Sequence, residues 1–262
     1  MAWKQIDICH QNALTELLNT NRCNTVVHLA AVCSREEILE DPAQARRTNV
    51  GGTEGLVEAF LRSDCQEFIY VSSGKVYAPT EHPKPISEEN ELGPTTPVGI
   101  LKLQCEEVIW EAARRHPERR FVCLRVFNAY GPGQSRHMLI PKIIDSLHTG
   151  CLEIGDCSIR RDYVYVDDVT NSVICNLGSD VGGCQTFNVG SGVAVSVGEI
   201  IRLVEDVSGK SIVLQINSDH FRRDEQRSET ADITKLKGLG WSPKWTMRRA
   251  LEELLQSRAL SL

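Results

Sequence analysis

The sequence has no long apolar run, no closely spaced pair of cysteines and no excess of positive charge. None of its apolar runs approaches the roughly 18 residues that are needed to span a bilayer. The first ten residues, MAWKQIDICH, are not followed by the apolar region of a secretory signal peptide. The formal net charge is −6 and the pI is about 5.7. We therefore expect no membrane segment and no nucleic-acid partner.

Metal-binding cysteine patterns are also absent, although the chain contains ten cysteines. No Cys-x-x-Cys pair occurs, and the closest two cysteines, Cys151 and Cys157, are separated by five residues. This spacing does not indicate a zinc site. Cys123 and Cys175 lie within apolar runs, which is typical of reduced, buried thiols. We predict a cytoplasmic protein without a structural metal.

The first half of the chain alternates short apolar runs with longer amphipathic segments. The runs at 25–32, 67–73 and 121–128 end in small or polar residues and predict strands that are buried on both faces of a parallel sheet. The segments 49–63 and 97–116 predict helices, and Pro97 and the basic residues at 114–116 suit the two ends of the second helix. This alternation predicts a doubly wound α/β fold.

The pattern changes after about residue 135. We expect a helix at 137–150, a strand that runs into a helix at 160–169, a further buried strand at 186–190 and a helix at 195–209. A strand at 211–217 and two helices at 231–238 and 246–257 would complete a smaller lobe. We predict two domains, 1–135 and 136–262, and expect strand 186–190 to return to the first domain.

Seven motifs carry a resemblance to a known family. They occur in the family's order and are HLAA (28–31), NVGGT (49–53), YVSSGKVYAP (70–79), LRVFNAYGPGQ (124–134), RRDYVYVDDV (160–169), FNVGSG (187–192) and ADITKLKGLGWSPK (231–244). The chain resembles the extended short-chain dehydrogenase/reductase family. It is most similar to the NAD-dependent nucleotide-sugar epimerases, of the UDP-glucose 4-epimerase type, and to the related dehydratases. The resemblance covers nearly the whole chain.

The resemblance implies a Rossmann-like sheet, NAD as the cofactor and a nucleotide-diphosphate sugar as the substrate. In such enzymes NAD takes a hydride from the sugar and later returns it. A Tyr, helped by a Ser or Thr and by a Lys four residues after the Tyr, removes the hydroxyl proton. The ammonium of that Lys lowers the pKa of the phenol from its reference of about 10. The position of the Ser corresponds to Ser73, and that of the Lys to Lys102.

The resemblance also implies binding residues. Substrate contacts map to Ser73, Asn128, Arg161 and Arg222, and the two arginines suit a nucleotide diphosphate by their charge and geometry. Cofactor contacts map to His28, Ala30, Ala31, Asn49 and Lys102. Local alternatives stay open: Ser73 could belong to a simple turn, Lys102 could serve only the nicotinamide ribose, and Arg161 could pair with Asp162.

The chain departs from the family pattern at the catalytic Tyr, because Val98 precedes Lys102 by four residues. None of the five tyrosines has a Lys four positions after it. The hydroxyls of Thr95 and Thr96 are far weaker acids than a phenol. Losing a positioned acid–base group typically costs about 10²–10⁴ in rate. We therefore expect impaired catalysis.

A second departure concerns the N-terminus. No Gly-rich GxxGxxG-type loop, which would let backbone N–H groups approach the pyrophosphate, precedes HLAA. Residues 3–18 instead resemble the family's third strand and the helix after it. We expect the first two strands to be missing, which would leave a gap between the third and fourth strands in the usual order 3-2-1-4-5-6. On this view the chain is truncated and binds NAD poorly.

Three interpretations stay open. The chain could be a fragment of an epimerase-like protein, or a degenerate member that binds a nucleotide sugar or a partner without catalysis. It could also be an interaction module that uses an exposed sheet edge. Gly74 and Lys75 stand where a dehydratase has two acidic residues, which favours an epimerase-like over a dehydratase-like protein. Family members often dimerise through the helix corresponding to 97–116, so a homodimer is possible.

Overall fold

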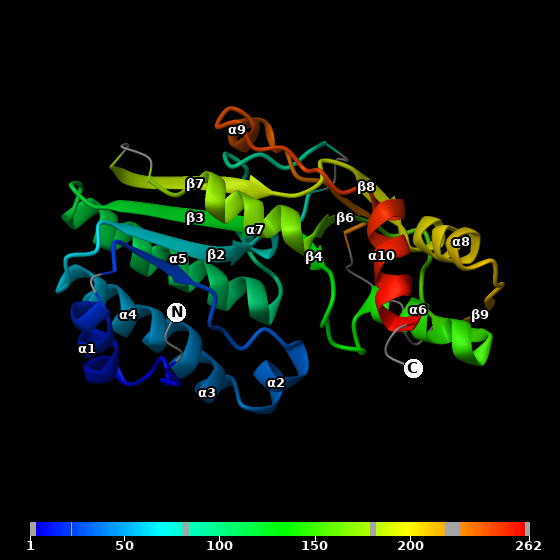
Figure 1. Cartoon of the computed structure of the whole chain (residues 1–262), viewed down its shortest axis with the longest axis horizontal. Coiled ribbons are helices and arrows are strands. Elements are labelled where there is room, and N and C mark those ends of the chain that lie inside the picture. Colours follow the sequence, from blue (N-terminus) through cyan, green and yellow to red (C-terminus); the bar gives the residue numbers. More distant parts are fainter. Residues whose placement is uncertain (1–3, 22, 81–83, 179–181, 218–225, 260–262) are drawn as a thin grey trace. The chain divides into compact units, whose positions relative to one another are not determined.

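The computed structural model describes residues 4–21, 23–80, 84–178, 182–217 and 226–259 (Figure 1). The contacts divide the chain into two compact units. Unit 1 comprises 1–79, 88–126 and 173–188, and unit 2 comprises 80–87, 127–172 and 189–262. Residues 127–135, which the sequence analysis groups with the first domain, belong to unit 2 in this division. Residues 173–188 belong to unit 1.

Unit 1 is built on a four-stranded sheet whose order is β1-β2-β3-β7. These strands are β1 (Thr25–His28), β2 (Glu67–Ser73), β3 (Arg120–Val126) and β7 (Gly183–Val189). β1, β2 and β3 run parallel, so their carboxyl ends meet at one edge of the sheet. The structure confirms the predicted parallel α/β fold and places the strand expected at 186–190 beside β3.

Three helices cover one face of this sheet: α1 (Gln11–Asn21), α4 (Gly52–Leu61) and α5 (Pro97–Arg115) (Figure 1). Phe60 of α4 and Ile109 of α5 are fully buried against Phe68 and Phe121 of the strands. The side chains that alternate with these on the strands, such as Ile69 and Val122, are also fully buried. Both faces of the sheet are therefore covered, which explains the nearly continuous apolar runs of β2 and β3.

The expectation for the N-terminal segment is confirmed for its helix, α1, but is wrong for its strand. Residues 4–10 form no strand, and among the described residues β1 is an edge of the sheet. Ile6 and Ile8 instead pack their partly buried side chains against the core. A Cβ on Gly52 would lie 2.8 Å from Cγ2 of Ile8, so the glycine permits this close approach to α4. Because the segment does not join the sheet, the expected gap between strands does not occur.

The helix expected at 49–63 starts earlier than the pattern indicated. A nearly continuous helical stretch runs through α3 (Pro42–Arg46), a π-helical turn (Arg47–Gly51) and α4. It begins where the carboxylate of Asp41 accepts a hydrogen bond from the Gln44 N–H. A short helix, α2 (Arg35–Glu40), precedes it and is capped by the Ser34 side chain. Sequence reasoning missed α2 and α3, because their turns are too short for a clear apolar period.

Unit 2 contains two small sheets and several helices. One sheet has the order β10-β6-β4, with β8 also paired to β6, and the other joins β5 to β9. The strands are β4 (Asn128–Tyr130), β5 (Cys151–Ile154), β6 (Arg160–Tyr165), β8 (Ala194–Ser196), β9 (Val213–Ile216) and β10 (Ser228–Glu229). The helices are α6 (Leu139–Thr149), α8 (Val197–Ser208), α9 (Thr234–Lys237) and α10 (Met247–Ala259), and α7 (Val166–Cys175) runs from unit 2 into unit 1.

The core of unit 2 lies among α6, α8 and α10. Ile143, Ile200 and Leu251, one from each helix, are fully buried. The expected helices at 137–150, 195–209 and 246–257 are confirmed within one to three residues at most ends. The expected strand-to-helix passage at 160–169 is also confirmed, as β6 leads directly into α7.

Candidate functional site

The carboxyl end of β2 holds the first predicted site residue, Ser73. Its hydroxyl oxygen accepts a hydrogen bond of 3.2 Å from the Lys75 N–H and so caps a short 3-10 turn, Gly74–Val76. The first turn of α5 approaches this turn closely. A Cβ on Gly99 would lie 2.2 Å from the Lys75 carbonyl oxygen, so only glycine fits there. Ser73 and the start of α5 are thus held together by backbone contact.

Lys102, on α5, is almost fully buried, with 6% of its surface exposed. Its Nζ donates a 2.7 Å hydrogen bond to the carbonyl oxygen of Val71, two residues before Ser73. It also lies 4.8 Å from the centroid of the Tyr70 ring. Burial lowers the pKa of Lys102 from its usual value. The structure therefore brings the two predicted catalytic positions to the same end of β2.

Position 98 carries no acid. Val98 is the second residue of α5, and its side chain is partly buried against the core of unit 1. The hydroxyl of Thr96 accepts a hydrogen bond from the Gly99 N–H and serves as the helix cap. Tyr70 is the tyrosine next to Lys102, and burial raises the pKa of its phenol far above the usual range. Its ring belongs to the core, so it does not replace the missing phenol.

His28 and Asn49, two predicted cofactor contacts, have buried side chains with partners inside unit 1. The Thr53 hydroxyl donates a hydrogen bond to the Asn49 carbonyl oxygen, so its oxygen accepts the 2.9 Å hydrogen bond from Nε2 of His28. Burial, aided by repulsion from Lys102, lowers the pKa of His28 to about 4. The Asn49 amide makes two hydrogen bonds to the backbone of Val32. It thereby fixes the loop that contains Ala30 and Ala31, which lie in no helix or strand.

A buried polar network that the sequence analysis missed lies one turn beyond Lys102. The carboxylate of Glu106 accepts hydrogen bonds from the Arg125 guanidinium and from the Ser72 hydroxyl. Arg125 also donates to the Tyr77 hydroxyl at 3.0 Å, and Tyr77 donates to the Asn188 side chain at 2.6 Å. Glu106 follows Lys102 by four residues on α5. This helical spacing was the one pattern that could have identified it.

In unit 2, Arg161 has 7% of its surface exposed. One of its terminal nitrogens donates to the carbonyl oxygens of Arg160 and Gln226, at 2.8 Å each. Its Nε lies 3.5 Å from a carboxylate oxygen of Glu229. The predicted alternative partner, Asp162, is not the residue that it pairs with. Arg222, the other predicted diphosphate ligand, lies outside the described residues.

Asp162 was not predicted as a site residue, yet it organises this part of unit 2. Its carboxylate accepts hydrogen bonds from the backbone N–H groups of Ser191, Gly192 and Ala231, at 2.6–3.0 Å, and from the Ser191 hydroxyl. Burial raises its pKa despite these bonds. Its backbone oxygen accepts a 2.9 Å hydrogen bond from the side chain of Asn128, a predicted substrate contact. Asp162 thus fixes the surroundings of Arg161 and Asn128.

The described residues form neither a metal-binding cluster nor a membrane-spanning helix. No group of three or more metal-binding side chains is found within the described ranges. No described helix is long and apolar enough to cross a membrane.

The chain is similar in sequence to known proteins of one family. Residues 2–190 match the model of the NAD dependent epimerase/dehydratase family. The chain is 30% identical over 242 residues to a GDP-6-deoxy-D-mannose reductase of Pseudomonas aeruginosa, a match that covers 88% of this chain and 79% of the reductase.

Two solved structures illustrate the similarity of the fold. RMD from Pseudomonas aeruginosa, complexed with NADPH, has a TM-score of 0.91 at 27% identity and is matched over 99% of this chain and 89% of its own. The UDP-glucose 4-epimerase of Thermotoga maritima with UDP-glucose has a TM-score of 0.88 at 26% identity, with 98% and 84% covered. With a family match over well over half of its length, this chain belongs to the NAD-dependent epimerase/dehydratase family.

Proposed function

We propose that this protein is an epimerase-like member of its family that binds a nucleotide-diphosphate sugar but is impaired in hydride-transfer catalysis. The observation that carries the proposal is Val98, an apolar side chain packed against the core four residues before Lys102. A valine cannot remove or return a hydroxyl proton. Ser73 and Lys102 alone could orient a sugar hydroxyl, but the acid–base step would lack its proton carrier.

The fit of NAD to the described residues supports the same proposal. Helices α2, α3 and α5 of unit 1 start with N–H groups that are capped by the side chains of Ser34, Asp41 and Thr96. Among the described residues of unit 1, no helix follows a strand through a Gly-rich turn. Lys102 and the loop after β1 could meet one end of a dinucleotide, but the pyrophosphate has no cradle in the described ranges. We therefore derive no catalytic step through NAD.

Binding of the nucleotide sugar is assigned to unit 2, residues of which surround Arg161. The guanidinium is fixed by two carbonyl oxygens, and its charge faces Glu229. A diphosphate could take the place of that carboxylate, because both are anions that suit the planar fork of an arginine. The proposed contacts in unit 2 are Asn128, Arg161 and Arg222, and Ser73 of unit 1 stays a predicted substrate contact. A homodimer through α5 stays a prediction.

The second candidate function is an active epimerase or reductase that uses a different acid. The intact Ser73 and Lys102 positions favour it, as do relatives that carry those enzyme names. In that case the purified protein should contain or bind NAD or NADP and turn over a nucleotide sugar.

The test uses the purified full chain in three assays. Released nucleotide is analysed after denaturation, interconversion of UDP-glucose and UDP-galactose is followed with added NAD, and UDP and UDP-glucose binding is measured by calorimetry. We expect no retained NAD, no turnover and weak binding of both ligands. Turnover above background would support the second candidate. A folded protein that binds neither ligand at millimolar concentration would leave only the fold and the family.

A further inference from the structure

Glu106, on α5, is a fully buried residue, 0% exposed, whose carboxylate lies beside the carboxyl end of β2. Arg125 of β3 donates to it through Nε, at 3.1 Å to both carboxylate oxygens, and through Nη2, at 2.7 Å. The remaining hydrogen bond comes from the Ser72 hydroxyl. Such a pair is costly to desolvate, and it survives burial only with several hydrogen bonds of good geometry. A buried ion pair at this place in the fold therefore needs a structural explanation.

The location of Ser72 supplies that explanation. It lies between Val71, whose carbonyl oxygen accepts the Lys102 hydrogen bond, and Ser73. Glu106 lies four residues after Lys102, on the same face of α5. The Ser72–Glu106 bond therefore joins α5 to β2 at the point where both predicted catalytic positions meet.

Arg125 extends the connection to the turn after Ser73. It donates to the Tyr77 hydroxyl, and its guanidinium lies 4.9 Å from the centroid of the Tyr77 ring. Burial would lower the pKa of Arg125, but the hydrogen bonds and charge of Glu106 outweigh burial and raise it. Burial raises the pKa of Tyr77 to about 12, so this phenol stays protonated at neutral pH. The network holds its charges in place across α5, β2 and β3.

We propose that Glu106 is a positioning residue for Lys102: through Ser72 it fixes α5 on β2, and its carboxylate places a negative charge one helical turn from the buried ammonium. The role given to Lys102 rests on the proposed function, whereas the contacts of Glu106 do not.

The charges around Lys102 support this assignment. The titratable groups that face it come from β1, β2, the loop after β1 and α5, and are His28, Tyr70, Cys33, Cys105 and Glu106. Thiols and phenols are largely neutral at pH 7, and the lowered pKa of His28 keeps the imidazole neutral as well. Glu106, which is paired with Arg125, is the acidic residue of this set. Its attraction opposes the effect of burial on the pKa of Lys102.

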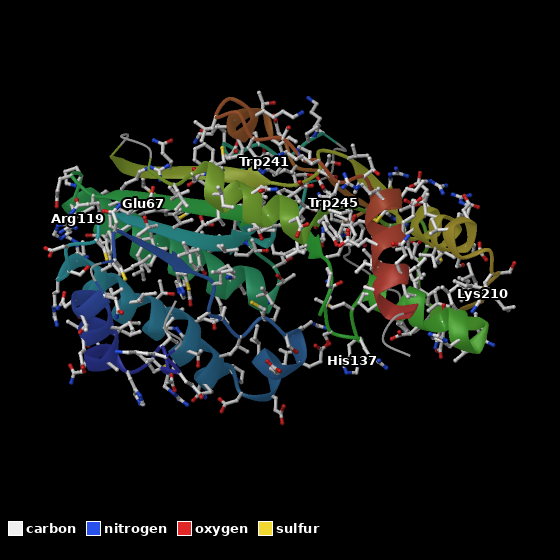
Figure 2. The ribbon with its side chains drawn as sticks, in the orientation of Figure 1. Glu67, Arg119, His137, Lys210, Trp241 and Trp245 are labelled. Atoms are coloured by element: carbon white, nitrogen blue, oxygen red, sulfur yellow. The ribbon has the colours of Figure 1, made fainter. Side chains whose placement is uncertain are left out.

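A matched control pair lies at the other end of the same strands. Glu67, labelled in Figure 2, starts β2. It is paired with Arg120, which starts β3, and both side chains are at most 7% exposed. In the sheet register Glu67 stands beside Arg120, and Ser72 stands beside Arg125. The two ion pairs thus have the same chemistry and similar burial. They differ in that only the Glu106 pair reaches the neighbourhood of Lys102.

The experiment is competitive labelling of lysines with trace acetic anhydride over a pH series, read by mass spectrometry, with exposed Lys210 as the internal reference (Figure 2). In Glu106→Gln we expect the midpoint for Lys102 to move to lower pH than in the wild type. Its relative labelling at pH 7 should rise roughly three- to tenfold, the change that the loss of one nearby charge produces. In Glu67→Gln we expect no change in the midpoint. In Ser72→Ala the midpoint should stay, while the limiting labelling rate rises as α5 loosens.

An unchanged midpoint in folded Glu106→Gln, or an equal shift in Glu67→Gln, overturns the proposal. If Glu106→Gln does not fold, the apolar pair Glu106→Leu with Arg125→Met replaces it, because buried ion pairs often tolerate apolar replacement. The midpoint should again move to lower pH, by less than in Glu106→Gln because the positive charge of Arg125 is removed together with the carboxylate, and the absence of any shift is again decisive. None of these readouts requires ligand binding, so failure of the proposed function would be seen separately by calorimetry.

Discussion

Lys102 in unit 1 and Arg161 in unit 2 are both buried cations at predicted site positions, with 6% and 7% of their surfaces exposed. Their partners differ. Lys102 donates to a neutral carbonyl oxygen, whereas Arg161 has two carbonyl oxygens and the carboxylate of Glu229. The lysine responds to burial by a lowered pKa. An arginine stays charged and must be paired.

Because their partners differ, the two residues would bind a ligand in different ways. Lys102 lies one helical turn from Glu106 but makes no ion pair within the described part of the chain. We therefore expect its ammonium to bind a new acceptor without breaking an ion pair. Arg161 must exchange Glu229 for a phosphate. We therefore expect Arg161 to matter both for stability and for binding, and Lys102 to matter mainly for the charge of the site.

The largest effect should come from Arg161→Met. This change removes the cation that faces Glu229 and the donor to two carbonyl oxygens, so the free energy of unfolding should fall by about 3–5 kcal/mol. Lys102→Met, in contrast, removes a desolvated charge and should be neutral or stabilising. Urea unfolding of both variants measures the comparison. If Arg161→Met and Lys102→Met lose equal free energy of unfolding, the different hydrogen-bond and charge partners of the two residues do not affect stability.

His28 should give unit 1 a pH dependence of about 3 kcal/mol. Its folded pKa of about 4 lies below the usual 6.5, so the folded state resists protonation. Stability should therefore fall as the pH drops from 6.5 to 4, and should not depend on His28 above 6.5. His28→Gln, measured by urea unfolding at pH 7 and pH 4, should lose most of that slope. His116→Gln, at a more exposed position, is the control, and an equal change there would contradict the assignment.

Substitutions of Arg161 and of Glu229 should change nucleotide binding in opposite directions. Arg161→Ala should weaken UDP binding roughly ten- to a hundredfold, because a charge-assisted hydrogen bond contributes about 1.5–3 kcal/mol. Arg222→Ala should have a similar effect, and Arg161→Lys should recover only part of the loss. Glu229→Gln should instead tighten binding by up to about tenfold, since the competing anion is removed.

Calorimetry at low and high salt measures these changes, and added salt should weaken the wild-type binding. If Glu229→Gln binds UDP more weakly than the wild type, the proposed exchange of carboxylate for phosphate is wrong.

The smallest effect should come from Val98→Tyr. The larger ring enters a partly buried position and should cost about 1–2 kcal/mol of stability through overpacking. It should not restore epimerisation, because the described residues offer no cradle for the pyrophosphate. Ile100→Tyr, at a position that is 44% exposed, is the matched control and should cost less. Epimerisation by Val98→Tyr alone would refute this expectation.

The order of the main elements, and which residues share a face of α5, follow from the sequence alone. The apolar runs of β2 and β3 are local patterns, and a helix fixes which residues are four apart, so Val98 and Lys102 share a face whatever surrounds them. The predicted strand at 67–73 likewise ends at Ser73, where β2 ends. These features follow from short-range geometry, which a single segment carries within itself.

The long-range partners of these residues, in contrast, are fixed by the tertiary structure. Ile6 and Ile8 had the alternation of a strand, but packing against α4 buried them without pairing. Arg161 has Glu229 and not Asp162 as its partner, and Asp162 binds Ala231, 69 residues away. Glu106 is separated by 34 residues from Ser72. Such contacts depend on which residues folding brings together, and no local period or spacing encodes that choice.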